Sequence, residues 1–286
     1  MAGSEASMQG KVVLVTGATG GIGKVAATEL ARLGAEVTIV GRDPARTAAA
    51  VTEIQAKSAN PNVSSLLGDL STLSEVRRVA AEFKAGHARL HVLLNNAGAL
   101  FHERLTTADG LEMTFALNHL AYFLLTAELL DLLKASAPAR IVNVSSDAHL
   151  GAKIDFDDLQ GEKRYTRWRA YGQSKLANIL FTRELARRLA GTGVTANCLH
   201  PGVVATGFGS GKGVMASLIK LGAPLMLSPE QGADTAIWLA SSPEAEGQTG
   251  KYFSKRKERR TSKAAKDDAV AQRLWRESEK LVGAPA

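Results

Sequence analysis

Short apolar runs alternate along this chain with longer segments in which apolar residues recur at helical spacing. The first pair is Lys11–Thr16, a run rich in β-branched residues, and a helical pattern over Gly21–Leu33 that stops at Gly34. Uninterrupted apolar strands are typical of a sheet that is covered on both faces. Strands joined by helices form parallel βαβ units with right-handed crossovers. The alternation therefore predicts an α/β fold: a doubly wound, mostly parallel seven-stranded sheet with helices on both faces.

The same alternation continues to the C-terminus without an internal repeat or a linker-like segment. At 286 residues, a single domain over 1–286 is expected. The expected strands are 11–16, 36–40, 64–67, 90–94, 140–144, 194–199 and 251–253, and the expected helices are 21–33, 44–56, 73–83, 111–134, 170–189, 229–240 and 267–281. Ligands of such a fold bind beyond the carboxyl ends of the strands.

Composition limits the cellular setting. Residues 1–9 are polar and are expected to be disordered, and they lack the apolar region of a secretory signal. The single cysteine, Cys198, excludes an intrachain disulfide and fits a reducing compartment. The longest apolar stretch, Leu117–Leu133, is interrupted by four polar residues, so no membrane span is expected. A cytoplasmic protein is predicted.

The net charge of +7 is concentrated near the C-terminus. Lys251–Lys266 carries eight lysines and arginines against one acid, Glu258. We expect residues 255–286 to form a C-terminal basic segment followed by a helix. Such a run is usually a solvated surface. The chain has no basic stripe with interleaved aromatic residues, so no nucleic-acid partner is expected. Nucleic-acid contact through Lys251–Lys266 stays open as a weaker alternative.

A glycine cluster, Thr16-Gly-Ala-Thr-Gly-Gly-Ile-Gly23, lies between the first predicted strand and the first predicted helix. Glycines there let the backbone approach a pyrophosphate, and the helix N-terminus stabilises its charge. This context is the one that dinucleotide binding requires, so a Rossmann-type cofactor site is predicted.

The spacing Gly17-x-x-x-Gly21-x-Gly23 resembles the short-chain dehydrogenase/reductase family. Six further motifs follow in the family's order: Asp69, Asn95-Asn96-Ala97-Gly98, Asn118, Ser145-Ser146, Tyr171-x-x-x-Lys175 and Pro201-Gly202. The resemblance covers nearly the whole chain and implies hydride transfer between a nicotinamide and a carbonyl or alcohol carbon. It implies cofactor contacts at Gly17, Thr19, Gly20, Gly21, Ile22, Gly23, Arg42, Asp69, Leu70, Asn95, Ala97, Gly98, Tyr171, Lys175, Pro201, Gly202, Val204 and Thr206. In the family, Asp69 would face the adenine, Asn95 the adenosine ribose and Thr206 the nicotinamide carboxamide.

The end of the second strand distinguishes the two nicotinamide cofactors. An acidic side chain there holds a ribose 2′-hydroxyl, whereas an arginine accommodates a 2′-phosphate. Gly41 stands at the expected acidic position and Arg42 follows it, which favours NADP(H). Asp43 keeps NAD(H) open, because a shift of one residue would bring its carboxylate to the ribose.

Four residues form the predicted catalytic set. A free tyrosine has a pKa near 10. Lys175, one helical turn after Tyr171, is expected to lower it with the help of the positive nicotinamide ring of the oxidised cofactor, so that Tyr171 acts as general acid and base. The family motif makes Ser146, rather than Ser145, the serine that stabilises the substrate oxygen. Asn118 is expected to bend its helix and hold a water that links Lys175 to solvent. A satisfied helix asparagine is the alternative.

The residues around this set resemble the retinol dehydrogenase-like branch of the family. The segment Lys153–Tyr165, together with Asn118-His119-Leu120 and Ser174–Thr182, carries this resemblance. It implies NADP(H) and a lipophilic aldehyde, ketone or alcohol as substrate. No N-terminal membrane anchor like that of the animal retinol dehydrogenases is expected for this chain, and a retinoid is therefore not singled out as its substrate. Residues 209–227 are expected either to form a lid over the substrate or to pack as an amphipathic helix.

Three further expectations concern metal or thiol chemistry, the oligomeric state and a competing function. His119, His149 and His200 show no metal-ligand spacing, and Cys198 fits a buried strand better than a nucleophile. The family analogy suggests a homodimer or homotetramer built through the helices near 111–134 and 170–189. The competing function is a regulatory or scaffold protein that binds NADP without turnover, although such a protein has no need of the phenol–ammonium pair.

Overall fold

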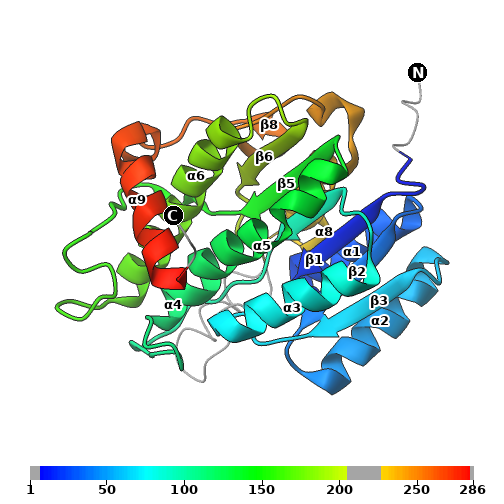
Figure 1. The fold of residues 1–286 in the computed structure, drawn as a ribbon, viewed down its shortest axis with the longest axis horizontal. Helices are drawn as coiled ribbons and strands as arrows, with labels where there is room; N and C mark the ends of the chain where they lie inside the picture. Colours follow the sequence, from blue (N-terminus) through cyan, green and yellow to red (C-terminus); the bar gives the residue numbers. More distant parts are fainter. Residues whose placement is uncertain (1–6, 205–226, 284–286) are drawn as a thin grey trace.

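The computed structural model describes residues 7–204 and 227–283. Its centre is one eight-stranded sheet in the order β3-β2-β1-β4-β5-β6-β7-β8 (Figure 1). The strands are β1 (Val12–Thr16), β2 (Glu36–Gly41), β3 (Val63–Leu67), β4 (Val92–Asn95), β5 (Ala139–Val144), β6 (Val194–Leu199), β7 (Tyr252–Ser254) and β8 (Lys257–Glu258). The seven predicted strands are confirmed to within two residues and pair in parallel. The eighth, β8, was not predicted and pairs antiparallel with β7.

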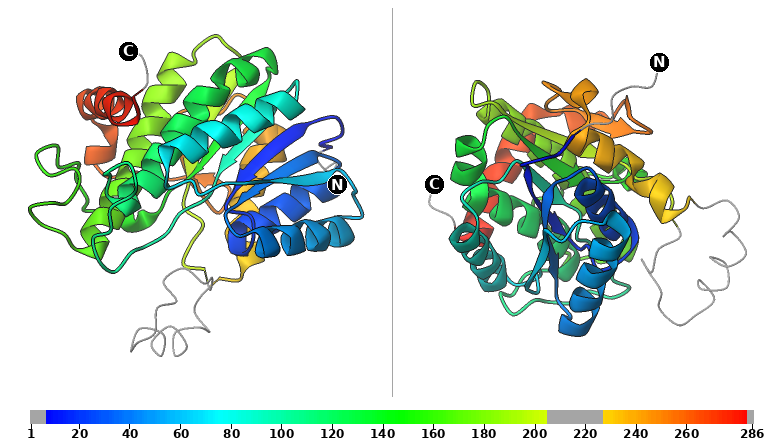
Figure 2. Two further views of the ribbon diagram at one scale, coloured as in Figure 1. Left: turned by 60° about the horizontal axis from the view of Figure 1, so that its bottom comes forward. Right: turned by 90° about the vertical axis from the view of Figure 1, so that its right-hand side faces the viewer.

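Helices cover both faces of the sheet, as the alternation predicts. The main helices are α1 (Gly21–Arg32), α2 (Pro44–Ser58), α3 (Leu73–Gly86), α5 (Ala121–Ala135), α6 (Arg167–Arg188), α8 (Pro229–Ser241) and α9 (Asp268–Val282). The core under α3, α5 and α6 is separate from the core under α1, α2 and α8, so the sheet has two buried faces (Figure 2). Burial on both faces explains why the strands are uninterrupted apolar runs.

The strand order reverses between β1 and β4. Strands β2 and β3 extend the sheet to one side of β1, while β4, β5, β6 and β7 extend it to the other. The register aligns Val15 with Leu94 and Leu94 with Val142, so β1, β4 and β5 end at one level. Such a reversal opens a crevice beyond the carboxyl ends of the strands, where ligands of this fold bind.

The long helix predicted over 111–134 is interrupted. A short helix α4 (Met113–Phe115) leads into a π-helical turn, η1 (Ala116–Leu120), which continues as α5. Among the described residues, Met113–Ala135 is the one helical stretch long and apolar enough to cross a membrane, but 67 % of its most apolar window is buried inside the molecule. A helix that packs against a sheet passes the same test.

The structure adds contacts at both ends of the chain that the sequence did not predict. Disorder over residues 1–9 is wrong for the described part, because Met8 is 4 % exposed and its N–H donates to Leu33 O at 2.9 Å. At the other end, α9 lies across α6 and the π turn (Figure 1), where Trp275 packs edge-on against Phe123 and stacks on Phe181. The helical face that was expected to meet a partner subunit is therefore covered, at this position, by the chain's own last helix.

The basic segment is only partly a free surface. Lys251 pairs with Glu258 at 3.0 Å, Arg259 with Asp147 at 3.3 Å, and Arg256 with Asp234. The turn between β7 and β8 holds Lys255 and Arg256 at φ of 53° and 57°, a left-handed conformation that side chains other than glycine and asparagine rarely adopt. The predicted lid, 209–227, lies outside the described residues except for Leu227.

Candidate active site

Tyr171 and Lys175 lie on α6, near the carboxyl end of β5. Lys175 is 2 % exposed, and its Nζ donates a hydrogen bond to the backbone O of Val144 at 3.1 Å. The same Nζ lies 5.6 Å from the centroid of the Tyr171 ring. The i, i+4 spacing thus places the ammonium beside the phenol, with the end of β5 as a shared support.

Burial dominates the titration of both groups. Burial raises the pKa of Tyr171 to about 12, although a hydrogen bond with the Ser146 side chain acts to lower it. Burial also lowers the pKa of Lys175 to about 7. In the chain by itself, desolvation disfavours the phenolate and the ammonium alike, so the pKa of Tyr171 is raised. The lowering expected with the oxidised nicotinamide bound stays a prediction.

The two serines after β5 face opposite ways. Ser145 is 1 % exposed, and its Oγ donates to the backbone O of Lys175 at 2.7 Å. Ser146 is half-buried, caps a short 3-10 helix (Asp147–His149) by accepting from Ala148 N at 3.2 Å, and meets the Tyr171 hydroxyl. Alternation along the strand therefore leaves Ser146, the serine favoured by the motif, on the side of Tyr171.

Asn118 lies inside the π turn and is fully buried. Its Oδ1 accepts from Ala99 N at 2.9 Å, and its Nδ2 donates to Ala99 O at 2.9 Å and to Ser174 Oγ at 3.1 Å. Its backbone O accepts from Asn178 Nδ2 at 2.9 Å. The expected helix distortion is present as the π turn, and protein groups hold the asparagine in place. The water-holding role stays a prediction.

The loop after Ser146 is held in place by contacts of Asp147 with residues that the motifs did not single out. Asp147 accepts a hydrogen bond from the Tyr252 hydroxyl at 2.8 Å, pairs with Arg259 at 3.3 Å and lies 3.5 Å from His200 Nε2. These contacts anchor the residue directly after Ser146 to the last strands. Their partners lie far along the chain, so spacing could not have revealed them.

The glycine turn has the geometry that a dinucleotide requires. Gly17 has φ +67°, and a Cβ there would lie 2.7 Å from the Cα of Ala97. A Cβ on Gly23 would lie 2.4 Å from Asn96 Nδ2, so α1 begins closely packed on the turn after β4. At Gly20, the N-cap of α1, a Cβ would meet nothing within 4 Å. A closely packed turn with open space at the helix N-terminus fits a pyrophosphate.

Asn96 supports this turn and was missed in the sequence. Its Nδ2 donates to Thr16 O at 2.9 Å and to Gly17 O at 3.1 Å, while Thr16 Oγ1 accepts from Asn96 N at 2.9 Å and from Ala97 N at 3.0 Å. Asn95 instead points into the core, with no exposed surface, and donates to Asn143 Oδ1 at 2.9 Å. The Asn95 side chain is thus engaged in the core, and the predicted place of Asn95 beside the adenosine ribose stays a prediction that its backbone would have to fulfil. Alternation across the end of β4 could have separated the two asparagines.

The end of β2 bears on the cofactor. Gly41 is buried so closely that a Cβ would lie 2.2 Å from Thr47 Oγ1 and 2.6 Å from Thr19 Cγ2. Arg42 is exposed. The carboxylate of Asp43 caps α2 by accepting from Arg46 N at 2.8 Å. Asp43 thus already has a structural role, whereas the Arg42 side chain extends into solvent.

The remaining predicted cofactor residues lie along the same edge of the sheet. Half-buried positions are Thr19, Gly21, Ile22, Asp69, Ala97, Gly98, Pro201, Gly202 and Val204, and Leu70 is buried. Asp69 Oδ1 accepts from Ser71 N at 3.0 Å, which fixes the turn after β3. Thr206 lies outside the described residues, so its predicted contact is not placed.

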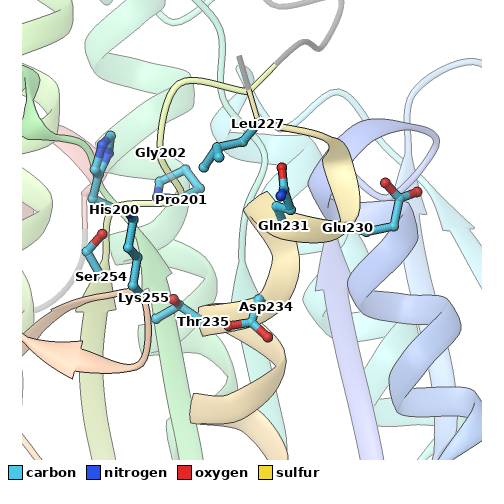
Figure 3. A pocket seen from close by; sticks show the side chains of 10 residues that line it. All are labelled: His200, Pro201, Gly202, Leu227, Glu230, Gln231, Asp234, Thr235, Ser254 and Lys255. Atoms are coloured by element: carbon cyan, nitrogen blue, oxygen red, sulfur yellow. The ribbon is translucent and has the colours of Figure 1, made fainter. Parts of the chain in front are cut away.

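A cavity of about 390 Å³ adjoins the loop after β6 (Figure 3). Its lining comes from that loop, from the first turns of α8 and from the turn after β7: His200, Pro201, Gly202, Leu227, Glu230, Gln231, Asp234, Thr235, Ser254 and Lys255. Neither Tyr171 nor Ser146 lines it. The cavity therefore neighbours the predicted nicotinamide loop from the α8 side and is separate from the catalytic set.

Metal and thiol chemistry find no support at this site. Within residues 7–204 and 227–283, no group of three or more histidine, cysteine or acidic side chains could hold a metal ion. Cys198 is 1 % exposed, and burial raises the pKa of its thiol to about 12, so the thiolate that a nucleophile needs is disfavoured.

Comparison with known proteins agrees with this geometry. The family model for short chain dehydrogenases matches residues 11–215. Mouse retinol dehydrogenase 12 is 48 % identical over 274 residues, which cover 96 % of this chain and 87 % of the relative. Human retinol dehydrogenase 13 is 46 % identical over 290 residues, 99 % of this chain and 88 % of the relative. The chain belongs to the short-chain dehydrogenase family, in its retinol dehydrogenase-like branch.

Solved structures of short-chain dehydrogenases share its fold. A crystal structure of an uncharacterised protein from Mycobacterium paratuberculosis has a TM-score of 0.81 at 35 % identity, covering 97 % of this chain and 95 % of that one. A Burkholderia cenocepacia short chain dehydrogenase in complex with NADP has a TM-score of 0.70 at 26 % identity, covering 86 % of this chain and 96 % of that one. This short-chain dehydrogenase is an oxidoreductase that acts with a nicotinamide cofactor.

Proposed function

We propose that this short-chain dehydrogenase reduces carbonyl compounds, or oxidises the corresponding alcohols, with NADP(H) and with Tyr171 as general acid and base. The observation that carries the proposal is the meeting of Tyr171, Ser146 and Lys175 beside the carboxyl ends of β1, β4 and β5, next to the glycine turn. A protein that only bound the cofactor could use Lys175 as a cofactor contact, but it would have no need of a phenol held between that amine and the Ser146 hydroxyl.

Each residue has a definite task in the reduction. The nicotinamide, when bound, supplies the hydride to the carbonyl carbon. The hydroxyls of Ser146 and Tyr171 hold the carbonyl oxygen and stabilise the charge that develops on it. A pKa of about 12 keeps Tyr171 protonated at neutral pH, so its hydroxyl has a proton to give to that oxygen. Lys175, in its ammonium form, then stabilises the phenolate that remains.

The preference for NADP(H) rests on the end of β2. Arg42 is exposed directly after the closely packed Gly41, where its planar guanidinium can donate two parallel hydrogen bonds to a 2′-phosphate. Asp43, the residue that kept NAD(H) open, has its carboxylate engaged in capping α2. The NADP complex of the Burkholderia cenocepacia relative is consistent with this choice.

The substrate is proposed to be lipophilic. Leu150, Trp168 and Val203 are 55 %, 58 % and 65 % exposed, the highest values among the large apolar side chains described. Leu150 follows Ser146 by four residues, and the ring of Trp168 lies 6.4 Å from that of Tyr171. Val203 follows the Pro201-Gly202 loop. An exposed aromatic ring beside Tyr171, with exposed apolar residues in the two loops that follow β5 and β6, favours an apolar ligand. The relatives found by sequence are named as retinol dehydrogenases.

A panel of aldehydes and ketones of increasing apolar size tests this function. Purified protein is mixed with NADPH and then with NADH, and nicotinamide absorbance is followed. We expect turnover of apolar aldehydes with a preference for NADPH. Tight binding of NADPH without turnover of any panel member, or of the matching alcohols with NADP, would favour the non-catalytic regulatory or scaffold role instead. The cytoplasmic location and the homo-oligomer stay predictions.

A further inference from the structure

A line of buried polar side chains connects the last helix to the catalytic lysine. Ser278 on α9, His119 in the π turn and Asn178 on α6 each have no exposed surface. Ser278 Oγ lies 2.9 Å from His119 Nε2, and His119 Nδ1 lies 3.3 Å from Asn178 Oδ1. Asn178 Nδ2 donates to Asn118 O at 2.9 Å and to Val144 O at 3.3 Å. Val144 O is the acceptor that Lys175 Nζ also uses.

The chemistry of the partners fixes the direction of every hydrogen bond. Carbonyl oxygens only accept, so the amide nitrogen of Asn178 must face Val144 and Asn118, and its Oδ1 must face His119. Because Oδ1 only accepts, His119 carries its proton on Nδ1. Burial lowers the pKa of His119 to about 4, so the ring is neutral at ordinary pH and Nε2 accepts from the Ser278 hydroxyl.

This line of hydrogen bonds constrains the catalytic centre at two points. Asn178 ties the end of β5, which leads into Ser146, to the π turn that holds Asn118. It also shares the Val144 carbonyl with Lys175 and so limits where the ammonium can lie. Each buried polar group has a partner along this line, and removing one leaves another buried and unsatisfied.

We propose that Asn178, oriented by His119 and Ser278, is a positioning residue for Lys175 and for the end of β5. The C-terminal helix thereby takes part in aligning the catalytic centre although it contributes no group to the reaction. This inference rests on the proposed function and extends it.

Three variants test the line at increasing distance from Lys175. Asn178→Ala removes both donated hydrogen bonds. His119→Phe keeps an aromatic ring against Phe115 but removes the orienting bond. Ser278→Ala removes only the last donor. Leu274→Ala is the matched control, because Leu274 is an apolar α9 residue with 1 % exposure and no hydrogen-bonding side chain. We expect kcat to fall by roughly 10- to 100-fold in Asn178→Ala and progressively less in the other two, with little change in KM.

The pH dependence separates positioning from general loosening. The titratable groups that face Lys175 Nζ are the phenols of Tyr122 and Tyr171, whose ring centroids lie 5.9 and 5.6 Å away. Loss of the Asn178 amide opens space for water beside the ammonium, which relieves its desolvation. The alkaline limb of kcat should therefore move to higher pH in Asn178→Ala and stay in place in Leu274→Ala.

The positioning role and the proposed function are contradicted by different results. Equal losses of kcat in Asn178→Ala and Leu274→Ala, with unmoved pH limbs, would overturn the positioning role. Absence of turnover in the unmodified protein would contradict the proposed function. The positioning role is then decided by thermal unfolding, where Asn178→Ala should show a weaker rise of stability between pH about 7 and 10.5 than the unmodified protein.

Discussion

Arg42 is the residue on which the choice of cofactor depends. A charge-assisted hydrogen bond to phosphate contributes about 1.5–3 kcal/mol. We therefore expect Arg42→Ala to weaken NADPH binding by roughly 10- to 100-fold and to leave NADH binding almost unchanged. The measurement is the dissociation constant of each cofactor by fluorescence titration. Arg89→Ala is the control, since Arg89 is also exposed but precedes β4 at the opposite end of the strands. Equal losses for both cofactors would contradict the assignment.

Burial of Lys175 should lower the stability of the folded chain at neutral and acidic pH. Its pKa is about 7 in the folded chain against an ordinary 10.5, so between these values the unfolded chain holds a proton that the folded chain does not. Stability conferred at this site therefore rises with pH across that window, and the full penalty applies below it. Lys175→Met should abolish turnover yet raise Tm below pH 7 by at least about 2–4 °C, the equivalent of about 1 kcal/mol.

The advantage of Lys175→Met should shrink as the pH approaches 10.5. Thermal unfolding followed by circular dichroism at several pH values measures this. Lys134→Met, on an exposed position near the end of α5, is the control and should show no such trend. A constant difference in Tm at all pH values would show that Lys175 is not desolvated.

Single residues of the site were predictable to different degrees. Tyr171, Lys175 and Ser146 could be placed because spacing along a helix and alternation along a strand fix their directions. Asn95 and Asn96 could not be separated by the motif alone. The pKa values were not predictable either, because they depend on burial by elements distant in sequence, as the raised pKa of Tyr171 in the chain by itself illustrates.

Among the helices, α9 should contribute to the free energy of unfolding through the packing of one aromatic side chain, Trp275. Trp275 packs against Phe123 and Phe181, and the guanidinium of Arg188 lies 4.1 Å from its ring centroid. Trp275→Ala should lower the free energy of unfolding by about 3 kcal/mol, the lower end of the range for removing a large core aromatic, because Trp275 is only half-buried. Urea unfolding measures the loss.

The neighbouring Arg276→Ala provides the control for Trp275→Ala, since Arg276 is exposed on the same helix. It should change the free energy of unfolding by less than about 0.5 kcal/mol. Similar losses for both variants would mean that helix propensity, rather than packing on α5 and α6, determines the contribution of α9.

The elements themselves followed largely from sequence periodicity. The strands β1 to β7 were predictable because each is a buried run bounded by turn residues. A bend at Asn118 was expected, but its form as a π turn over Ala116–Leu120 was not predictable, because the apolar pattern there is continuous with that of α5. The strand β8 has only two residues and depends on the left-handed turn at Lys255–Arg256, where no glycine marks the hairpin.

For the whole molecule, the sheet topology is what turns scattered motifs into a site. The reversal of strand order between β1 and β4 brings the glycine turn beside the loops that follow β4 and β5. Residues as far apart as Gly17 and Lys175 therefore border one crevice. The sequence was sufficient for this arrangement because βαβ handedness leaves few topologies. It was insufficient for the covering of α5 and α6 by α9, which depends on long-range packing.

In the proposed reaction, Tyr171 transfers the proton while the nicotinamide transfers the hydride. The most direct test is the single-turnover reduction of an apolar aldehyde by NADPH in Tyr171→Phe. Tyr165→Phe is the control. The Tyr165 hydroxyl donates a hydrogen bond to Phe101 O, with an O–O distance of 3.2 Å, and is not bonded to Ser146 or Lys175. The account predicts a loss of roughly 10²- to 10⁴-fold in the rate of the chemical step for Tyr171→Phe, with NADPH affinity nearly intact. A rate equal to that of the unmodified protein would contradict it.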